Sequence, residues 1–230
     1  MKAVGYLRSL PVDDERSLFD FETDVPRPEG RDLLVEVQAI SVNPLDAVQR
    51  MRKESVDGTP VVLGWDVAGI VSAVGSEVRF FQGGDHVLLS CDLRRSGGNA
   101  GYLLAADRVV AAKPASLSFA EAASLPLTAI TAWEALFDRL RVPVGPGSSD
   151  DRILLIGAAG GVGSIALQLL KARTALEVIA TASRPESRDW LARLGADVVL
   201  DHSQPLMPQF AQAGISSVRY DLPLSHTLHH

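Results

Sequence analysis

The spacing of apolar residues divides the chain into a first half of short strands and a second half in which strands and helices alternate. In the first half, short apolar segments cover residues 33–37, 67–71, 86–89 and 108–111, and glycine-containing turns separate them. This pattern predicts a β-rich, barrel-like domain.

The apolar period becomes helical at Ser118. Ser118 and Glu121 have the spacing of a capping box, in which a serine is the N-cap and a glutamate the third helical residue. Apolar residues then recur at helical spacing through Leu136, with an interruption at Pro126. We expect the second domain to begin here, which predicts domains of residues 1–117 and 118–230.

The second half begins with a strand, a glycine-rich turn and a helix. Residues 153–156 are all apolar, the segment 157–163 reads Gly-Ala-Ala-Gly-Gly-Val-Gly, and a helical pattern covers residues 164–171. A strand before such a turn and a helix after it are typical of a Rossmann-type turn that binds a dinucleotide. Ala158 occupies the place of the first glycine of the usual motif, and Gly157 is the alternative for the tight turn.

The remaining glycines of this turn have separate expected roles. Gly160 and Gly161 lack side chains, so the backbone there can approach a pyrophosphate, and Gly163 allows the helix to pack closely on the strand. The unpaired N–H groups at the positive end of the helix would then bind the phosphates. We therefore predict a cofactor site at four consecutive residues, Gly160, Gly161, Val162 and Gly163.

Alternation continues after the turn, with a strand at 178–181, a helix at 185–194 and a strand at 198–200. This order predicts a right-handed βαβαβ half of a doubly wound parallel sheet, so the fold class is α/β. A weak strand pattern at 217–220 follows. The chain ends near the fourth strand, and we expect strand 153–156 to have an unpaired edge and the dinucleotide crevice to be incomplete.

The end of the second Rossmann strand favours NADPH over NADH. An NAD site needs a carboxylate there, yet the sequence reads Thr-Ala-Ser-Arg at 181–184, and no acid occurs before Glu186. Arg184 can form charge-assisted hydrogen bonds with a 2′-phosphate, and Ser183 can donate another. The alternative is a solvated arginine in front of a helix.

Composition excludes several classes of partner. Hydrophobic residues make up 47% and charged residues 22%, and the net charge of -6 gives no basic surface for nucleic acid. We identify no signal peptide at the N-terminus and no apolar run of membrane-spanning length. Cys91 is the only cysteine, which excludes an intramolecular disulfide and fits a cytoplasmic protein. We interpret Cys91 as a packing residue rather than a nucleophile.

Several motifs in this order resemble the medium-chain dehydrogenase/reductase superfamily. The first-domain motifs are Ser-Val-Asn-Pro-Leu-Asp at 41–46 and Leu-Gly-Trp-Asp-Val-Ala-Gly at 63–69, and a third motif at 125–133 precedes the glycine turn. Within the superfamily, the chain is similar to the zinc-free quinone oxidoreductases related to zeta-crystallin, over residues 1–204. The resemblance implies a GroES-like domain, an NADPH-binding Rossmann domain and a chain truncated at its C-terminus.

The resemblance also implies roles for individual residues. Zinc-dependent members supply cysteine and histidine ligands, whereas this chain has Asn43 in the first motif and Trp65 in place of a histidine, so we expect no metal site. The family places Asn43 beside the nicotinamide ribose and the substrate, and Thr131 near the nicotinamide and the pyrophosphate. Asp46 is the ionisable group nearest to this Asn-Pro motif and is a candidate for catalysis. The alternative role for Asp46 is to cap a helix. Val48 replaces a tyrosine of related reductases.

The expected reaction is hydride transfer from NADPH to a quinone or an α,β-unsaturated carbonyl compound, with a proton taken from water. The alternative is a nucleotide-binding or crystallin-like structural protein without turnover. Asn43, Thr131 and Arg184 together favour the enzyme, whereas Val48 and the early end of the chain favour the binding protein. The family often forms dimers, so a homodimer is among the expected partners. The histidines show no clear metal-ligand spacing, and for the three in the tail, His226, His229 and His230, a tag remnant or a disordered end is the alternative to a ligand cluster.

Overall fold

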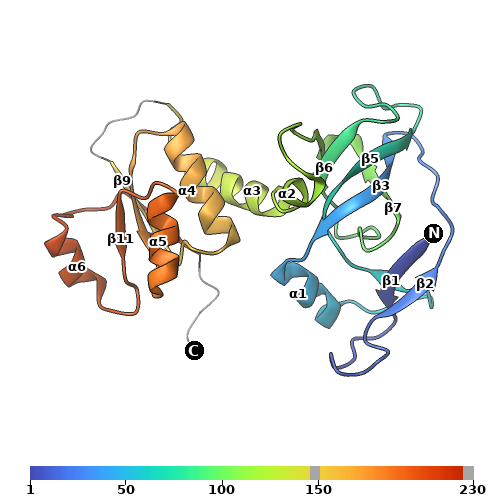
Figure 1. The fold of residues 1–230 in the computed structure, drawn as a ribbon, viewed down its shortest axis with the longest axis horizontal. Coiled ribbons are helices and arrows are strands. Elements are labelled where there is room, and N and C mark those ends of the chain that lie inside the picture. The colour runs from blue at the N-terminus through green and yellow to red at the C-terminus, as the bar shows by residue number, and fades with distance from the viewer. Residues whose placement is uncertain (146–150, 225–230) are drawn as a thin grey trace. The chain divides into compact units, whose positions relative to one another are not determined.

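A computed structural model describes residues 1–145 and 151–224 (Figure 1). The chain divides into two compact units, Met1–Leu127 and Thr128–His230. The end of the predicted loop 142–149 and the three tail histidines lie outside the described residues. Within the described residues, no helix is long and apolar enough to cross a membrane.

The first unit contains two antiparallel sheets. One has the strand order β2-β1-β4 and the other the order β7-β3-β5-β6-β8. Inward-facing residues such as Leu33, Val35, Val67 and Val87 form the core of the larger sheet and are fully buried. The strands are β1 (Lys2–Tyr6), β2 (Phe19–Glu22), β3 (Asp32–Ser41), β4 (Val61–Val62), β5 (Asp66–Val74), β6 (His86–Ser90), β7 (Tyr102–Ala106) and β8 (Val110–Ala112).

The segment predicted as a strand at 108–111 is divided in the structure. Asp107–Val109 form a 3-10 turn, and only the residues from Val110 onward join the sheet as β8. The Asp107 carboxylate is buried and paired with Arg31 at 2.9 Å, and its backbone N–H donates to the Arg31 carbonyl. These two contacts with Arg31, which is distant in the sequence, stabilise the turn. The local pattern of apolar residues therefore could not predict it.

Two short helices close the first unit. The helix α1 (Pro44–Arg52) follows β3, and α2 (Phe119–Ala123) packs on the larger sheet through Ala122 and Ala123 against Ala68. The predicted capping box of α2 is confirmed, because the Ser118 N–H donates to Glu121 Oε2 at 2.8 Å and the Glu121 N–H donates to Ser118 Oγ at 3.2 Å. A new helix, α3 (Pro126–Trp133), begins at the predicted interruption, and a π-helical segment, Glu134–Arg139, continues it.

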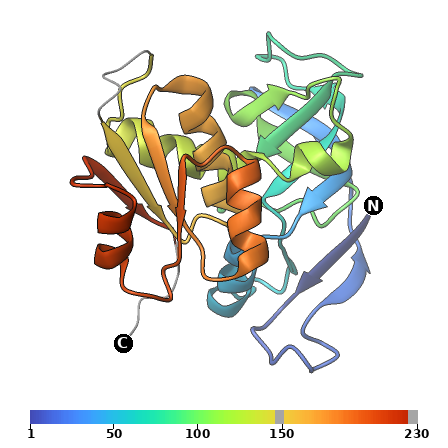
Figure 2. The same ribbon diagram turned by 60° about the vertical axis from the view of Figure 1, so that its left-hand side comes forward.

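The second unit contains the predicted parallel α/β sheet, with the strand order β11-β10-β9-β12. Leu155 and Val178 face helices α4 and α5, whereas Leu154 and Ile179 face α6, so helices cover both faces (Figures 1 and 2). The elements are β9 (Arg152–Ile156), α4 (Gly161–Arg173), β10 (Glu177–Thr181), α5 (Pro185–Arg193), β11 (Val198–Leu200), α6 (Leu206–Gln212) and β12 (Tyr220–Pro223).

The fourth strand corrects one expectation from the sequence. The weak strand signal at 217–220 overlaps β12 only at Tyr220, where β12 begins; β12 pairs in parallel with β9, with Leu222 opposite Leu155. Strand β9 is therefore a central strand with partners on both sides, and the expectation of an unpaired edge at 153–156 is wrong. The sequence-based expectation underestimated β12 because Asp221 and Pro223 weaken its apolar alternation.

Candidate functional site

The glycine turn joins β9 to α4 at the carboxyl edge of the parallel sheet. Gly157 has φ = 72°, the left-handed conformation that glycine adopts without strain. Its N–H donates to Thr181 Oγ1 at 3.0 Å, and the N–H of Ala158 donates to the Thr181 carbonyl at 3.0 Å. Gly157 thus makes the tight turn, and fully buried Ala158 takes the place of the usual first glycine.

The next three glycines differ in what surrounds them. A Cβ at Gly160 would meet no atom within 4 Å, whereas one at Gly161 would lie 3.2 Å from Thr128 Cγ2 of α3. A Cβ at Gly163 would lie 2.3 Å from the carbonyl oxygen of Ala158, so the predicted close packing of helix on turn is observed. Open space at Gly160, the N-cap of a helix of 13 residues, leaves room for a phosphate at the helix N-terminus.

Thr181 and His202 belong to this edge, and the sequence analysis missed them. Thr181 is fully buried at the end of β10, and its hydroxyl bonds His202 Nδ1 at 2.9 Å in addition to accepting from Gly157. His202 is exposed and follows β11. Because both strands are parallel to β9, their carboxyl ends meet beside the glycine turn. Only the pairing of the strands reveals this contact.

Ser183 and Arg184 follow β10 at the same edge and are both exposed. Arg184 is the N-cap of α5, and among the described residues it has no salt-bridge partner. Arg188, one turn later, is paired with Asp201 at 2.7 Å. Of these two arginines, Arg184 is therefore the one whose guanidinium is available to a bound anion.

In the first unit, Asn43 and Asp46 form the N-terminus of α1. The Asn43 N–H donates to Asp46 Oδ2 at 2.7 Å, and the Gly64 N–H donates to Asp46 Oδ1 at 3.0 Å. Both oxygens of this buried carboxylate thus accept backbone hydrogen bonds. The arrangement matches the helix-capping alternative for Asp46.

The Asn43 side chain bonds a second buried acid, Asp66, which the sequence analysis did not single out. Asn43 Nδ2 donates to Asp66 Oδ2 at 2.9 Å, and the Leu127 N–H at the start of α3 donates to Asp66 Oδ1 at 2.7 Å. Asp66 is completely buried at the start of β5. Burial raises the pKa of Asp66 to about 6, although these two hydrogen bonds act in the opposite direction. The nearby charge of Asp46 makes a smaller contribution to this increase.

The side chains around this cluster do not fit a zinc ion. Trp65 is buried, and an indole cannot replace a histidine ligand. Burial raises the pKa of the Cys91 thiol to about 12, so the thiolate that zinc prefers is disfavoured. Across residues 1–145 and 151–224, no group of three or more His, Cys, Asp and Glu residues could hold a metal ion.

The predicted site residues thus form two groups, each within one unit. Asn43 and Asp46 lie together near Asp66, and the glycine turn lies together with Ser183 and Arg184. Thr131 lies exposed on α3, and Thr128 of the same helix is the residue whose methyl group approaches Gly161.

Comparison with known families assigns both parts of the chain. Residues 29–129 match the family described as alcohol dehydrogenase GroES-like domain. Residues 161–214 match the family described as zinc-binding dehydrogenase.

Individual relatives agree with this assignment. A zinc-type alcohol dehydrogenase-like protein of Staphylococcus epidermidis is 43% identical over 96% of this chain and 65% of its own length. A 2-methylene-furan-3-one reductase of Solanum lycopersicum is 35% identical over 89% of this chain and 53% of its own length. The chain therefore spans less than two thirds of the length of these relatives.

Solved structures share the fold. That of a zinc-dependent alcohol dehydrogenase homologue from Rhizobium etli has a TM-score of 0.91 and 49% identity, covering 99% of this chain and 66% of its own. The Escherichia coli quinone oxidoreductase complexed with NADPH has a TM-score of 0.74 and 26% identity, covering 95% of this chain and 64% of its own.

Proposed function

Because this chain belongs to the medium-chain dehydrogenase/reductase superfamily, we propose that the protein transfers hydride from NADPH to a quinone or an α,β-unsaturated carbonyl compound without zinc. The observation that carries the proposal is the glycine turn at the N-terminus of α4. Open space at Gly160 and the tight contact at Gly163 suit a pyrophosphate on the N–H groups of Gly161 and Val162.

The preference for NADPH over NADH rests on Arg184. Ser183 and Arg184 follow β10 directly. In a Rossmann fold, residues at this place contact the 2′-position of the bound adenosine ribose. The segment 181–185 contains no acidic residue, so it holds no carboxylate that would repel a phosphate there. A structural relative from Escherichia coli binds NADPH, which supports the same assignment.

Independence from zinc rests on the chemistry of the residues at the metal position. Asn43 and Trp65 stand where zinc-dependent relatives supply ligands, and neither an indole nor an amide hydrogen-bonded to a carboxylate is a good zinc ligand. We therefore assign no step of the reaction to a metal.

The substrate class is supported by relatives that reduce an enone or are described as quinone oxidoreductases. When bound, NADPH would supply a hydride to the electrophilic carbon, and the resulting enolate or quinol anion would take a proton from water. The residues of this chain bind and orient the reactants: the glycine turn and Arg184 hold the phosphates, and we assign Thr131 to the cofactor and Asn43 to a ligand hydroxyl. We assign Asp46 to the capping of α1, on the backbone hydrogen bonds that both of its oxygens accept.

The test follows NADPH oxidation at 340 nm with a simple quinone and with a simple enone, beside a thermal-shift titration with NADPH. We expect stabilisation by NADPH and oxidation with at least one substrate. Stabilisation without oxidation would favour the nucleotide-binding alternative, and absence of both would reject the proposal. Sedimentation and cell fractionation of the complete protein test the predicted homodimer and cytoplasmic location.

A further inference from the structure

The amide of Asn43 has a fixed orientation. Nδ2 lies 2.9 Å from Asp66 Oδ2 and 3.5 Å from the Ser41 carbonyl oxygen, and both neighbours are hydrogen-bond acceptors. Rotating the amide by 180° would place Asn43 Oδ1 against these two oxygens, and none of the three can donate a hydrogen bond to another. The amide therefore uses both of its N–H groups within the protein.

Only one polar atom of the Asn43 side chain then remains for a ligand. Asn43 Oδ1 faces the Asp46 N–H in the capping box at the N-terminus of α1, and a carbonyl oxygen can accept a second hydrogen bond. Asn43 is half-buried, so a ligand can still reach this residue. A carbonyl oxygen can accept hydrogen bonds but cannot donate them.

The carboxylate that imposes this orientation is itself held on both sides. Asp66 Oδ2 accepts from Asn43, and Asp66 Oδ1 accepts from the Leu127 N–H at 2.7 Å. Because both oxygens face donors, a proton on Asp66 would have no acceptor unless the Asn43 amide rotated to offer its own oxygen. The ionisable groups that face Asp66 are Asp46 of α1 and the Cys91 thiol after β6.

We propose that Asp66 is a positioning residue for the hydride-transfer site: it holds the Asn43 amide so that Asn43 presents only an acceptor oxygen. Asn43 then binds a hydroxyl group of the ligand, such as a ribose hydroxyl, and cannot polarise the carbonyl of a quinone or enone. This inference rests on the function proposed above. It assigns Asn43 to orientation of the reactants rather than to stabilisation of an oxyanion.

The test is an exchange of donor and acceptor. In Asp66→Asn, the new amide must accept from Leu127 through its oxygen, so its nitrogen faces Asn43 and forces the Asn43 amide to rotate. We expect kcat/KM for NADPH-dependent reduction to fall by about tenfold or more. In the double variant Asn43→Asp with Asp66→Asn, the nitrogen at position 66 donates to the carboxylate at position 43, which still offers an acceptor to the ligand. We expect this exchange to restore kcat/KM to within about threefold of the wild type.

Asp107→Asn is the matched control, since Asp107 is another buried carboxylate of the first unit, paired with Arg31 and not with Asn43. It should lower the melting temperature without changing kcat/KM. Equal losses in Asp66→Asn and Asp107→Asn at equal stability, or no recovery in the double variant, would overturn the inference.

A second readout does not depend on turnover. The 230 residues contain only two asparagines, Asn43 and Asn99, so selective ¹⁵N-asparagine labelling of the protein gives few side-chain amide signals. We expect an Asn43 amide proton shifted downfield by the Asp66 carboxylate, and its return to an ordinary position in Asp66→Asn. An unshifted signal in the wild type would overturn the inference. A shifted signal in a protein that oxidises no NADPH would instead reject the proposed function while the Asp66–Asn43 contact stands.

Discussion

Gly163 and Ala158 lie in direct backbone contact, where the first turn of α4 packs on the end of β9. A Cβ at position 163 would lie 2.3 Å from the carbonyl oxygen of Ala158 and 2.6 Å from its Cα. Two residues of the same turn, Gly160 and Gly163, thus have opposite requirements. Gly163 maintains helix packing, whereas Gly160 leaves a space open.

This difference predicts opposite results for two glycine-to-alanine changes. Gly163→Ala should lower the free energy of unfolding by about 1–3 kcal/mol, because rigid backbone must move to admit the methyl group. Gly160→Ala should leave stability nearly unchanged and weaken NADPH binding, since its methyl group would occupy the phosphate space. Denaturant unfolding and NADPH titration of both variants check this. Equal stability losses would contradict the assignment of separate roles.

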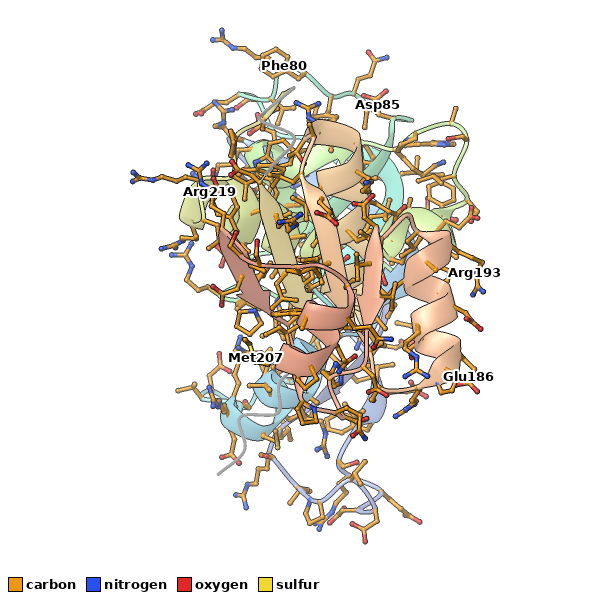
Figure 3. The ribbon with its side chains drawn as sticks, turned by 90° about the vertical axis from the view of Figure 1, so that its left-hand side faces the viewer. Phe80, Asp85, Glu186, Arg193, Met207 and Arg219 are labelled. Atoms are coloured by element: carbon orange, nitrogen blue, oxygen red, sulfur yellow. The ribbon has the colours of Figure 1, made fainter. Side chains whose placement is uncertain are left out.

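Arg184→Glu should raise the KM for NADPH by about tenfold or more while changing the KM for NADH little. A carboxylate at a helix N-terminus does not destabilise the helix, so the effect should be confined to binding. Arg193→Glu is the control, since Arg193 lies at the other end of α5 and projects from it (Figure 3). Equal increases for the two cofactors would reject the role of Arg184 in binding a 2′-phosphate.

Thr181→Val tests the contact between β10 and the glycine turn. Valine has nearly the same shape but leaves the half-buried Gly157 N–H without its acceptor at 3.0 Å. We expect a loss of about 1–3 kcal/mol in unfolding free energy, together with weaker NADPH binding. Thr181→Ser keeps the hydroxyl and should retain most of the affinity. If valine and serine behave alike, the hydroxyl does not position the turn.

The second unit could be predicted from the sequence more completely than the first. Strands β9, β10 and β11 are buried runs between helices with clear periods, so local pattern and fold agree. In the second unit helix α6 was not predicted, and in the first unit strands β1, β2, β4 and β7 and helix α1 were not predicted. Helix α1 has the low mean hydropathy of a polar helix, and β2 alternates only half-buried and exposed residues, so neither gives a strong apolar signal.

The site was predictable only where one continuous segment forms it. The glycine turn and Arg184 lie in one βαβ unit, so their spacing along the chain contains the signal. Asp66 contacts Asn43, 23 residues earlier, and Leu127, 61 residues later. Such contacts depend on the pairing of β3 with β5 and on the start of α3, which no local period encodes. The clue available in the sequence was Asp66 itself, an acidic residue beside Trp65 within the otherwise apolar motif 63–69.

Cys91 should react slowly with iodoacetamide in the folded protein. Burial, together with the nearby Asp66 carboxylate, raises the pKa of its thiol to about 12, so thiolate is scarce at pH 8. We expect alkylation to be at least about tenfold slower than that of a free cysteine, and to become rapid in denaturant. Mass spectrometry follows the modification. Rapid labelling of the folded protein would contradict the raised pKa and the partly buried position of the thiol.

Asp66 should make stability depend on pH in a direction opposite to that of a salt-bridged acid. Its pKa of about 6 in the folded protein exceeds the ordinary value of 3.8, so the folded state binds the proton more tightly than the unfolded chain. Its favourable contribution is complete below about pH 4 and is lost as the pH rises through 6, a change of about 3 kcal/mol. We expect the unfolding free energy of the wild type, minus that of Asp66→Asn, to decrease over this interval and then to level off. Subtracting the unfolding free energy of the variant removes the pH dependence that other acids contribute to both proteins. Asp32 is one such acid, because Arg95 lowers its pKa. A difference that stays constant from pH 4 to 7 would show that Asp66 titrates like an exposed aspartate.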